Sequence, residues 1–225
     1  MSVFVTNLPS KTGAISASTP HKKSRVYRDV LKPCFDWLSI AMAGALAMPL
    51  IAALAALVAT DGHSPFYSQK RIGKNGRIFR MWKLRTMVPN ADKMLESYLA
   101  ENPAAKAEWD ATQKLKKDPR ITPIGRLLRK SSMDELPQLF NVLRGDMSLV
   151  GPRPMMVDQR DLYPGLGYFR VRPGITGLWQ VSDRNECDFQ ERAKFDDKYD
   201  RDISLKTDVI VLLKTFKVVC RGTGY

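Results

Sequence analysis

Two adjacent carboxylates, Asp134 and Glu135, stand just before an apolar helical run and are the residues of this chain best suited to chemistry. An aspartate carboxylate can attack phosphorus and form an acyl phosphate. A second carboxylate can hold Mg²⁺, which neutralises charge on a transferring group. A helix start adds amide donors and the positive end of the helix dipole. The pair therefore indicates phosphoryl-transfer chemistry.

The same pair also has a purely structural explanation. Ser132 and Glu135 match the S-x-x-E capping box, and acidic residues are favoured in the first turn of a helix. From spacing alone the cap is the stronger interpretation. Pro137 weakens it, because with Ser132 as N-cap the proline falls where an amide donor is wanted. With Asp134 as N-cap, the proline falls within the first turn and costs little. The spacing leaves both roles open.

Basic residues in glycine- and proline-rich turns are the candidate phosphate ligands. Arginine binds phosphate through two parallel hydrogen bonds, and such turns place side chains on loops rather than in a core. A single arginine is more often a surface residue, but four in such turns are harder to dismiss. The candidates are Arg144 (LRGD), Arg153 (GPRP), Arg172 (RPG) and Arg184 (DRN), with Lys83 and Arg85 upstream.

The composition narrows the class of protein. The chain has 225 residues, 44% of them hydrophobic, and a net charge of +13, which fits one domain with appendages and a preference for polyanions. Three scattered cysteines and two histidines argue against a disulfide scaffold or a zinc site. No nucleic-acid-binding motif is present, so nucleic acid is not expected as a partner.

Residues Trp37–Thr60 form a run of 24 residues without a charge, and about 20 apolar residues suffice to cross a bilayer as a helix. Pro49 lies near its middle and must kink or break the helix. Each half then reaches only ~18 Å at 1.5 Å per residue, too short to cross ~30 Å of hydrocarbon.

The charges on both sides of this run favour a re-entrant anchor. Residues 21–36 carry +3 and residues 61–90 carry +6, and positive flanks prefer the cytoplasmic side. A hairpin kinked at Met48-Pro49 keeps both flanks inside, whereas a simple span must move one across. A kinked full span and a buried core helix remain alternatives. A signal peptide fits poorly, because 36 residues precede the run.

The remaining pattern predicts an α+β, mostly helical fold. We expect a flexible tail over 1–20, the membrane anchor with its basic flanks over 21–62, and a cytoplasmic catalytic domain over 63–225. That domain should contain a β-hairpin over 68–87 that turns at Lys74-Asn75-Gly76, loop and strand over 169–181, and several helices. The expected helices are 91–117, interrupted near Pro103, then 124–130, 136–144 and 204–221.

The last of these helices is amphipathic. Val209, Leu212, Leu213, Phe216 and Val219 form its predicted apolar stripe, opposite a basic face. Packing on the core and lying on a membrane surface explain that stripe equally well.

Four stretches carry a resemblance to a known family. They are KPCFDWLSI leading into the Pro49 anchor, FYSQKRIGKNGRIFRMWKLRTM, DPRITPIGRLLRKSSMDELPQLFNVLRGDMSLVGPRP and VRPGITGLWQVSDRN. Through them the chain resembles the bacterial sugar transferases, the monotopic phosphoglycosyl transferases that start polysaccharide assembly. The resemblance runs from about Lys32 to Arg221.

The resemblance implies a reaction and its site. Members move a sugar 1-phosphate from a UDP-sugar to undecaprenyl phosphate at the cytoplasmic face of the bacterial inner membrane, release UMP, use Mg²⁺ and supply downstream glycosyltransferases. By that likeness Asp134 is the nucleophile, Glu135 a metal ligand and Arg153 a phosphate ligand. Lys83, Arg85, Arg172 and Arg184 match basic positions lining the site. Met48-Pro49 matches the helix-breaking dipeptide, where many members have Ser before the proline.

Within the family the chain resembles the short members that start exopolysaccharides with galactose or glucose. The competing function, from another class, is a non-catalytic adaptor that binds anionic membrane surfaces through its basic residues.

Overall fold

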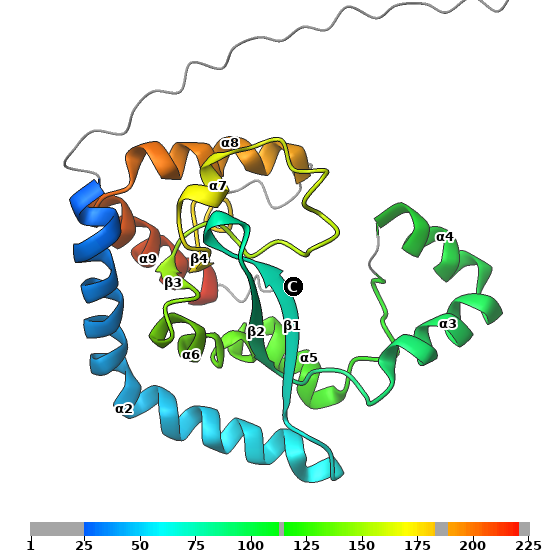
Figure 1. Ribbon diagram of the computed structural model, residues 1–225. Helices are drawn as coiled ribbons and strands as arrows, with labels where there is room; N and C mark the ends of the chain where they lie inside the picture. Colours follow the sequence, from blue (N-terminus) through cyan, green and yellow to red (C-terminus); the bar gives the residue numbers. More distant parts are fainter. Residues whose placement is uncertain (1–24, 113–114, 183–188, 221–225) are drawn as a thin grey trace, which may run out of the picture.

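The computed structural model describes residues 25–112, 115–182 and 189–220 (Figure 1). The predicted tail over 1–20 lies outside these residues. The described chain is mostly helical, with two small two-stranded sheets. Its longer helices are α2 (Lys32–Val58), α3 (Ala91–Glu101), α4 (Pro103–Thr112), α5 (Pro123–Lys130), α8 (Phe189–Asp202) and α9 (Leu205–Cys220), and the short α6 (Gln138–Leu143) and α7 (Gly167–Arg170) complete the set.

The apolar run forms one long helix that bends in its middle (Figure 1). A π-helical turn, η1 (Tyr27–Leu31), leads into α2, and a 3₁₀ turn, η2 (Ala59–Asp61), follows it. Pro49 lies inside α2, and proline is a common cause of such bends. The predicted kink is therefore present. No turn separates the two halves, so the structure shows one bent helix and does not confirm the predicted re-entrant hairpin.

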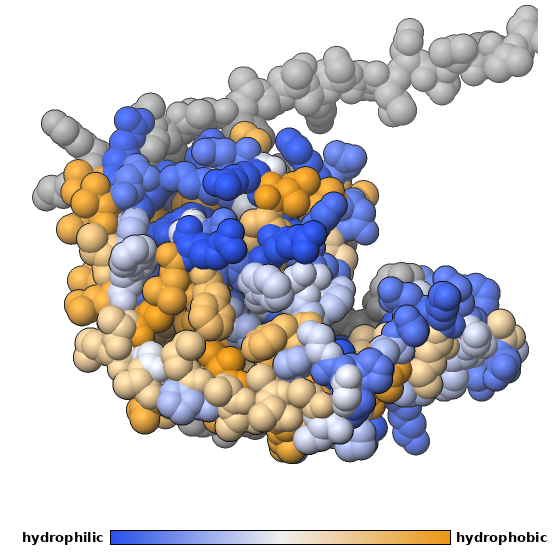
Figure 2. All heavy atoms as spheres, turned by 60° about the horizontal axis from the view of Figure 1, so that its bottom comes forward, coloured by the Kyte–Doolittle hydropathy of each residue, from blue (hydrophilic) through white to orange (hydrophobic). Residues whose placement is uncertain are grey.

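Most apolar side chains of α2 have no protein covering them. Only 11% of its most apolar window is buried, and Leu46 is 82% exposed. A core helix of a soluble protein would be mostly buried. The buried exceptions, such as Ile40 and Val58, pack on the rest of the chain. Figure 2 shows apolar surface spread over the lower left of the molecule, where α2 runs.

A buried aspartate fixes the first half of α2 to the rest of the fold. Asp36 is fully buried and accepts hydrogen bonds from the Ser148 hydroxyl at 2.8 Å and from the backbone N–H of Leu149 at 3.1 Å. The Arg172 guanidinium forms an ion pair with it at 3.1 Å. A buried carboxylate needs such partners, so this cluster sets how α2 lies against the strand that carries Ser148.

A second buried cluster ties the start of the described chain to its end. Lys32 Nζ lies 2.5 Å from Asp208 Oδ2. The hydroxyls of Tyr27 and Tyr199 each donate to Asp208, both at 2.7 Å. The partners come from η1, α2, α8 and α9, so this one carboxylate joins four helical elements.

The predicted β-hairpin is confirmed. Strands β1 (Phe66–Ile72) and β2 (Ile78–Leu84) pair antiparallel, with Gln69 opposite Met81. The turn η3 (Lys74–Gly76) contains Asn75 at φ 58° and Gly76 at φ 76°, the left-handed conformations that Asn and Gly tolerate best. Residues 79, 81 and 83 share one face of the hairpin with their partners 71, 69 and 67.

A short parallel sheet holds two arginine-bearing loops together; it contains the strand predicted within 169–181, whereas its partner strand and their pairing were not predicted. Strand β3 (Ser148–Val150) pairs with β4 (Gly174–Thr176). A Cβ on Gly174 would come within 2.1 Å of the backbone nitrogen of Gly151. Only glycine allows this approach, so the GPRP and RPG turns need their glycines to lie side by side.

The predicted helices over 124–130, 136–144 and 204–221 and the interruption at Pro103 are confirmed, with ends shifted by a few residues. Helix α8 was not predicted. In α9, Val211 is fully buried in the core, whereas Leu213 and Phe216 are 64% and 71% exposed. The predicted stripe therefore faces mostly outward, because the buried Asp208 and Val211 direct the other side of the helix toward the core.

We expect Asp36→Ala to lower the free energy of unfolding by about 3–5 kcal/mol, because it leaves the Arg172 charge buried without its partner. Chemical unfolding of the purified protein in detergent measures this loss. Asp29→Ala is the matched control: Asp29 forms an exposed ion pair with Lys74, so its loss should cost about 0–1 kcal/mol. Equal stability of the two variants would contradict the role given to Asp36.

Candidate active site

The two carboxylates lie on a 3₁₀ turn, η4 (Met133–Glu135), that precedes α6. Ser132 takes the left-handed conformation at φ 56°, and its side chain makes no capping hydrogen bond. The predicted capping box is therefore wrong. The backbone N–H of Glu135 bonds to the Ser132 carbonyl instead, at 3.2 Å. Pro137 is the N-cap of α6, where it costs no backbone hydrogen bond.

Lys83 of β2 contacts both carboxylates. Its Nζ lies 2.7 Å from Glu135 Oε1 and 3.4 Å from Asp134 Oδ2. All three side chains are largely but not fully covered, with exposures of 22% for Lys83, 11% for Asp134 and 20% for Glu135. One ammonium therefore holds two adjacent carboxylates that would otherwise repel each other.

Asn141 brings β2 to the carboxylates. This α6 residue is 1% exposed, and its side-chain amide bonds to the backbone of β2 twice. Its Oδ1 accepts from the Trp82 N–H at 3.0 Å, and its Nδ2 donates to the Arg80 carbonyl at 2.7 Å. Because Lys83 follows Trp82 directly, these bonds fix the lysine beside the turn that carries Asp134 and Glu135.

The two carboxyls differ in acidity. Burial raises the pKa of Asp134 above its ordinary value, and the neighbouring Glu135 charge adds to this, while Lys83 only partly offsets it. Burial would also raise the pKa of Glu135, but Lys83 and then Arg153 outweigh it, so the pKa of Glu135 is lowered. Partial withdrawal from water keeps the Asp134 oxygens less solvated, which favours a nucleophile.

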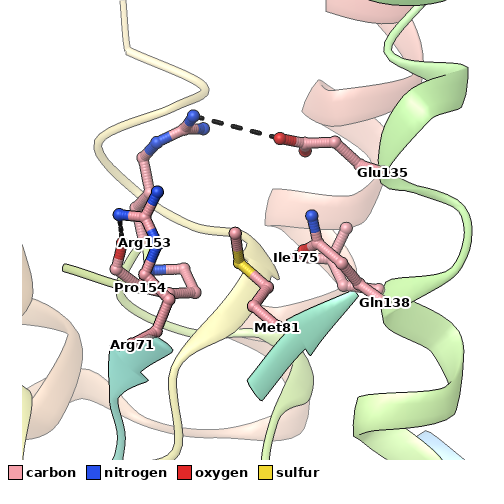
Figure 3. A pocket seen from close by; sticks show the side chains of 7 residues that line it. All are labelled: Arg71, Met81, Glu135, Gln138, Arg153, Pro154 and Ile175. Atoms are coloured by element: carbon pink, nitrogen blue, oxygen red, sulfur yellow. Dashed lines mark hydrogen bonds and ion pairs between the residues drawn. The ribbon is translucent and has the colours of Figure 1, made fainter. Parts of the chain in front are cut away.

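Arg153 faces Glu135 across a small pocket (Figure 3). Its guanidinium lies 3.9 Å from Glu135 Oε1 and is 45% exposed, so it is available to a ligand. Arg71 lies beside Arg153 on the same side of the pocket, opposite Glu135 and Gln138 (Figure 3). The other lining residues are Met81, Pro154 and Ile175.

The loop that carries Arg153 is held along its backbone. The guanidinium of Arg192 donates to the Arg153 carbonyl, and that of Arg71 donates to the Pro154 carbonyl at 3.1 Å. The Met155 carbonyl accepts from the N–H of Ile72 at 3.1 Å, and the Met155 N–H donates to the Tyr168 hydroxyl, also at 3.1 Å. Because the backbone is fixed on both sides, the Arg153 side chain is presented to the pocket from a rigid base.

The remaining predicted basic residues do not join this group. Arg172 binds the buried Asp36. Arg85 binds Asp61, with its Nη2 2.6 Å from Asp61 Oδ1, and donates to the carbonyls of Val58, Ser64 and Met87. Arg144 is 71% exposed, and its nearest acidic partner is Asp146 at 3.7 Å. Arg184 lies outside the described residues, and Met48 and Pro49 lie in α2, as predicted.

Four residues near the site were missed in the sequence. Arg71 lies on the same hairpin face as Lys83, which the register of a turn at 74–76 could have revealed. Arg129 contributes a nearby positive charge to Asp134, and its Nε donates to the Thr86 hydroxyl at 2.9 Å. Gln138 and Asn141 looked like ordinary helix residues, since nothing in their spacing signals a polar role.

The two carboxylates could supply protein oxygens to Mg²⁺ but do not by themselves form a complete metal site. Among the residues that the structure describes, no group of three or more His, Cys, Asp or Glu side chains could hold a metal. Mg²⁺ usually binds one or two carboxylates together with substrate phosphates and water. Glu135, with Asp134 beside it, supplies that number of protein oxygens.

Comparison with known proteins identifies a family. The sequence profile of the family described as "Bacterial sugar transferase" matches residues 27–222. The chain is 44% identical to the exopolysaccharide production protein ExoY of Rhizobium meliloti over 220 residues, which is 96% of this chain and 93% of that protein.

Two longer relatives match over part of their length. The chain is 47% identical to the undecaprenyl-phosphate galactose phosphotransferase of Salmonella typhimurium, over 86% of this chain and 41% of that protein. It is 36% identical to the UDP-glucose:undecaprenyl-phosphate glucose-1-phosphate transferase of Klebsiella pneumoniae, over 80% of this chain and 38% of that protein.

The matches place the chain in the class of transferases, so the hypothesis of a non-catalytic adaptor is wrong. More particularly, the chain belongs to the bacterial sugar transferase family, whose profile covers most of its length.

We expect Arg85→Met to lower the midpoint of thermal unfolding, because Arg85 joins the end of α2 to the start of the hairpin through one carboxylate and three carbonyls. Scanning fluorimetry in detergent measures the midpoint. Arg144→Met is the matched control, since Arg144 is exposed and should tolerate the change. An unchanged midpoint in Arg85→Met would show that Arg85 does not hold the fold.

Proposed function

We propose that this protein transfers hexose 1-phosphate from a UDP-sugar to undecaprenyl phosphate and releases UMP, through a covalent intermediate on Asp134. The observation that carries the proposal is the contact of Lys83 with both Asp134 and Glu135, at the edge of a pocket that also holds Arg153. A carboxylate of raised pKa beside cations is suited to attack an anionic phosphorus, because the cations offset the repulsion.

The names of the relatives support the choice of substrates. Two are named for undecaprenyl phosphate as acceptor, one with galactose and one with UDP-glucose. We therefore propose galactose or glucose as the hexose. The similarity to ExoY over nearly its full length supports a place in exopolysaccharide production, in which this step would supply lipid-linked sugar to downstream glycosyltransferases.

The proposed reaction has two displacements at one phosphorus. An Asp134 carboxylate oxygen bonds to the β-phosphorus of the UDP-sugar, and the bond from that phosphorus to the bridging oxygen breaks, so UMP leaves with that oxygen. A phosphate oxygen of undecaprenyl phosphate then bonds to the same phosphorus, and the bond to Asp134 breaks. The product is undecaprenyl diphosphate hexose, and the Asp134 carboxylate is restored.

The other residues of the site would offset the negative charge of the reacting groups. Lys83 holds the Asp134 carboxylate in place and lowers the repulsion between it and the incoming diphosphate. Arg153, fixed by its loop, is proposed to bind a phosphate oxygen. Glu135, together with Asp134, would hold Mg²⁺, which when bound neutralises charge on the departing UMP.

The exposed apolar helix supports a membrane location. The apolar side of α2, with the outward residues Leu213 and Phe216 of α9, offers a surface that suits lipid better than water. We propose that α2 enters the cytoplasmic leaflet of the bacterial inner membrane and returns, which keeps its basic flanks on the cytoplasmic side. The active site then lies near the depth of the undecaprenyl phosphate headgroup.

We expect Asp134→Asn to abolish turnover and also the release of UMP in a single turnover without lipid acceptor. The amide is a poor nucleophile, while its size is unchanged. Rapid-quench measurement of UMP with UDP-galactose or UDP-glucose and Mg²⁺ tests this, and wild type should release close to one equivalent. Asp158→Asn, at an exposed position, is the matched control. A full burst from Asp134→Asn would refute the nucleophile assignment.

We expect both flanks of α2 to be protected from a membrane-impermeant thiol reagent in intact cells, because a re-entrant helix leaves both ends in the cytoplasm. Two single-cysteine variants test this: one keeps Cys34, which is exposed, and the other carries Ser64→Cys. Each should react only after the cells are permeabilised. Reaction of either flank in intact cells would favour a full span.

A further inference from the structure

The pocket beside Glu135 is lined by a largely buried glutamine. Gln138 is 2% exposed and lines the pocket, next to Met81 and Ile175. Among the described residues its side-chain amide has no hydrogen-bond partner, and its polar atoms are not among the fully buried ones that lack a partner, so the amide opens onto the pocket. Buried amides usually have partners, because an unpaired one costs free energy. An amide that opens onto a pocket is therefore expected to find its partner in a ligand.

Across the pocket, Arg71 is held by neutral groups alone. Its Nη1 donates to the Pro154 carbonyl and its Nη2 to the Gln69 side-chain oxygen at 2.6 Å, and its Nε is buried without a hydrogen-bond partner. Burial and the neighbouring Arg153 charge lower the pKa of Arg71. A covered guanidinium beside a second one calls for an anion close by.

The charges around the pocket also favour an anionic ligand. Three cationic side chains and two carboxylates lie at or beside the pocket. They are Lys83, Arg71 and Arg153, and Asp134 and Glu135. Lys83 is engaged by the carboxylates and Arg153 touches Glu135 only loosely at 3.9 Å. The uncompensated positive charge therefore lies on the arginine side, where Gln138 faces it (Figure 3).

We propose that Arg71 and Gln138 form the floor of a subsite for one phosphate group, distinct from the phosphate that reacts at Asp134. The subsite rests on the proposed function and deepens it. Met81, Pro154 and Ile175 line the rest of the pocket, so part of a bound phosphate would be sheltered from water. The pocket is too small for a base or a sugar ring. The ligand chemistry is that of a phosphate monoester or diester.

Two substrates carry such a group. One is the α-phosphate of the nucleotide, which stays with UMP, and the other is the phosphate of the lipid acceptor. Both are anions of the same chemistry, and separate binding measurements distinguish them. UMP probes the nucleotide and a short-chain polyprenyl phosphate probes the lipid.

Gln138→Leu and Gln138→Glu test the subsite in the full-length protein in detergent with Mg²⁺ present. Leucine removes the amide, and glutamate adds a negative charge at the same place. Isothermal titration should show UMP or polyprenyl phosphate binding weakened about tenfold to a hundredfold in Gln138→Leu, and weakened further in Gln138→Glu. Asn75→Asp adds the same charge at the exposed hairpin turn and should bind like wild type.

Arg71→Lys provides a second test, because it keeps the charge but loses the planar donor set, and it should weaken the same ligand. Thermal unfolding identifies any variant that is merely unfolded. Weaker UMP binding alone assigns the subsite to the nucleotide, and weaker polyprenyl phosphate binding alone assigns it to the acceptor.

Unchanged affinity for both ligands in folded Gln138→Leu and Gln138→Glu would overturn the subsite. Release of UMP from UDP-sugar by the wild type, measured in the same preparation, keeps the two proposals apart. If the wild type releases UMP while the variants bind both ligands normally, the subsite fails and the proposed function stands. If phosphate binding depends on Gln138 but no UMP is released, the subsite stands and the proposed function fails.

Discussion

The ion pair of Lys83 with Glu135 and Asp134 is the interaction on which the site depends. Adjacent carboxylates withdrawn from water repel each other, and a single ammonium at 2.7 and 3.4 Å makes their proximity tolerable. The lysine can do this only because Asn141 bonds β2 to α6. The hairpin and the carboxylate-bearing turn, 51 positions apart in the chain, thus become one unit.

The long helix is coupled to this unit through buried charge. Asp36 of α2 binds the first two residues of β3 and the Arg172 side chain, and β3 runs directly into the loop that presents Arg153. The same chain of contacts that orients α2 therefore orients the loop of the pocket. Under the proposed function this coupling between α2 and the pocket matters. An enzyme that joins a water-soluble donor to a lipid must hold its nucleophile at a fixed depth relative to the bilayer.

The sequence predicted what depends on local pattern. The apolar run, its bend at Pro49, the hairpin with its Asn-Gly turn and most helices follow from hydropathy, proline and turn chemistry over a few residues. Lys83, Arg153 and the carboxylate pair were identified as candidates, and the structure brings them together. Arg85 and Arg172 show what local sequence pattern cannot predict. In the sequence each is a plausible phosphate ligand, but in the structure each binds a carboxylate of the anchor region. Arg71 and Gln138 were missed for the converse reason, since only tertiary packing reveals that both side chains line the pocket beside Glu135.

The central claim is that Asp134 carries the transferred sugar phosphate. Incubation of the purified protein with UDP-sugar and Mg²⁺ but no lipid, followed by acid quench, proteolysis and mass spectrometry, would locate the adduct directly. The account predicts a hexose phosphate on the peptide that contains Asp134, and its disappearance when undecaprenyl phosphate is added before the quench. A protein that turns over with lipid present but never carries an adduct, or carries it on another residue, would contradict the account.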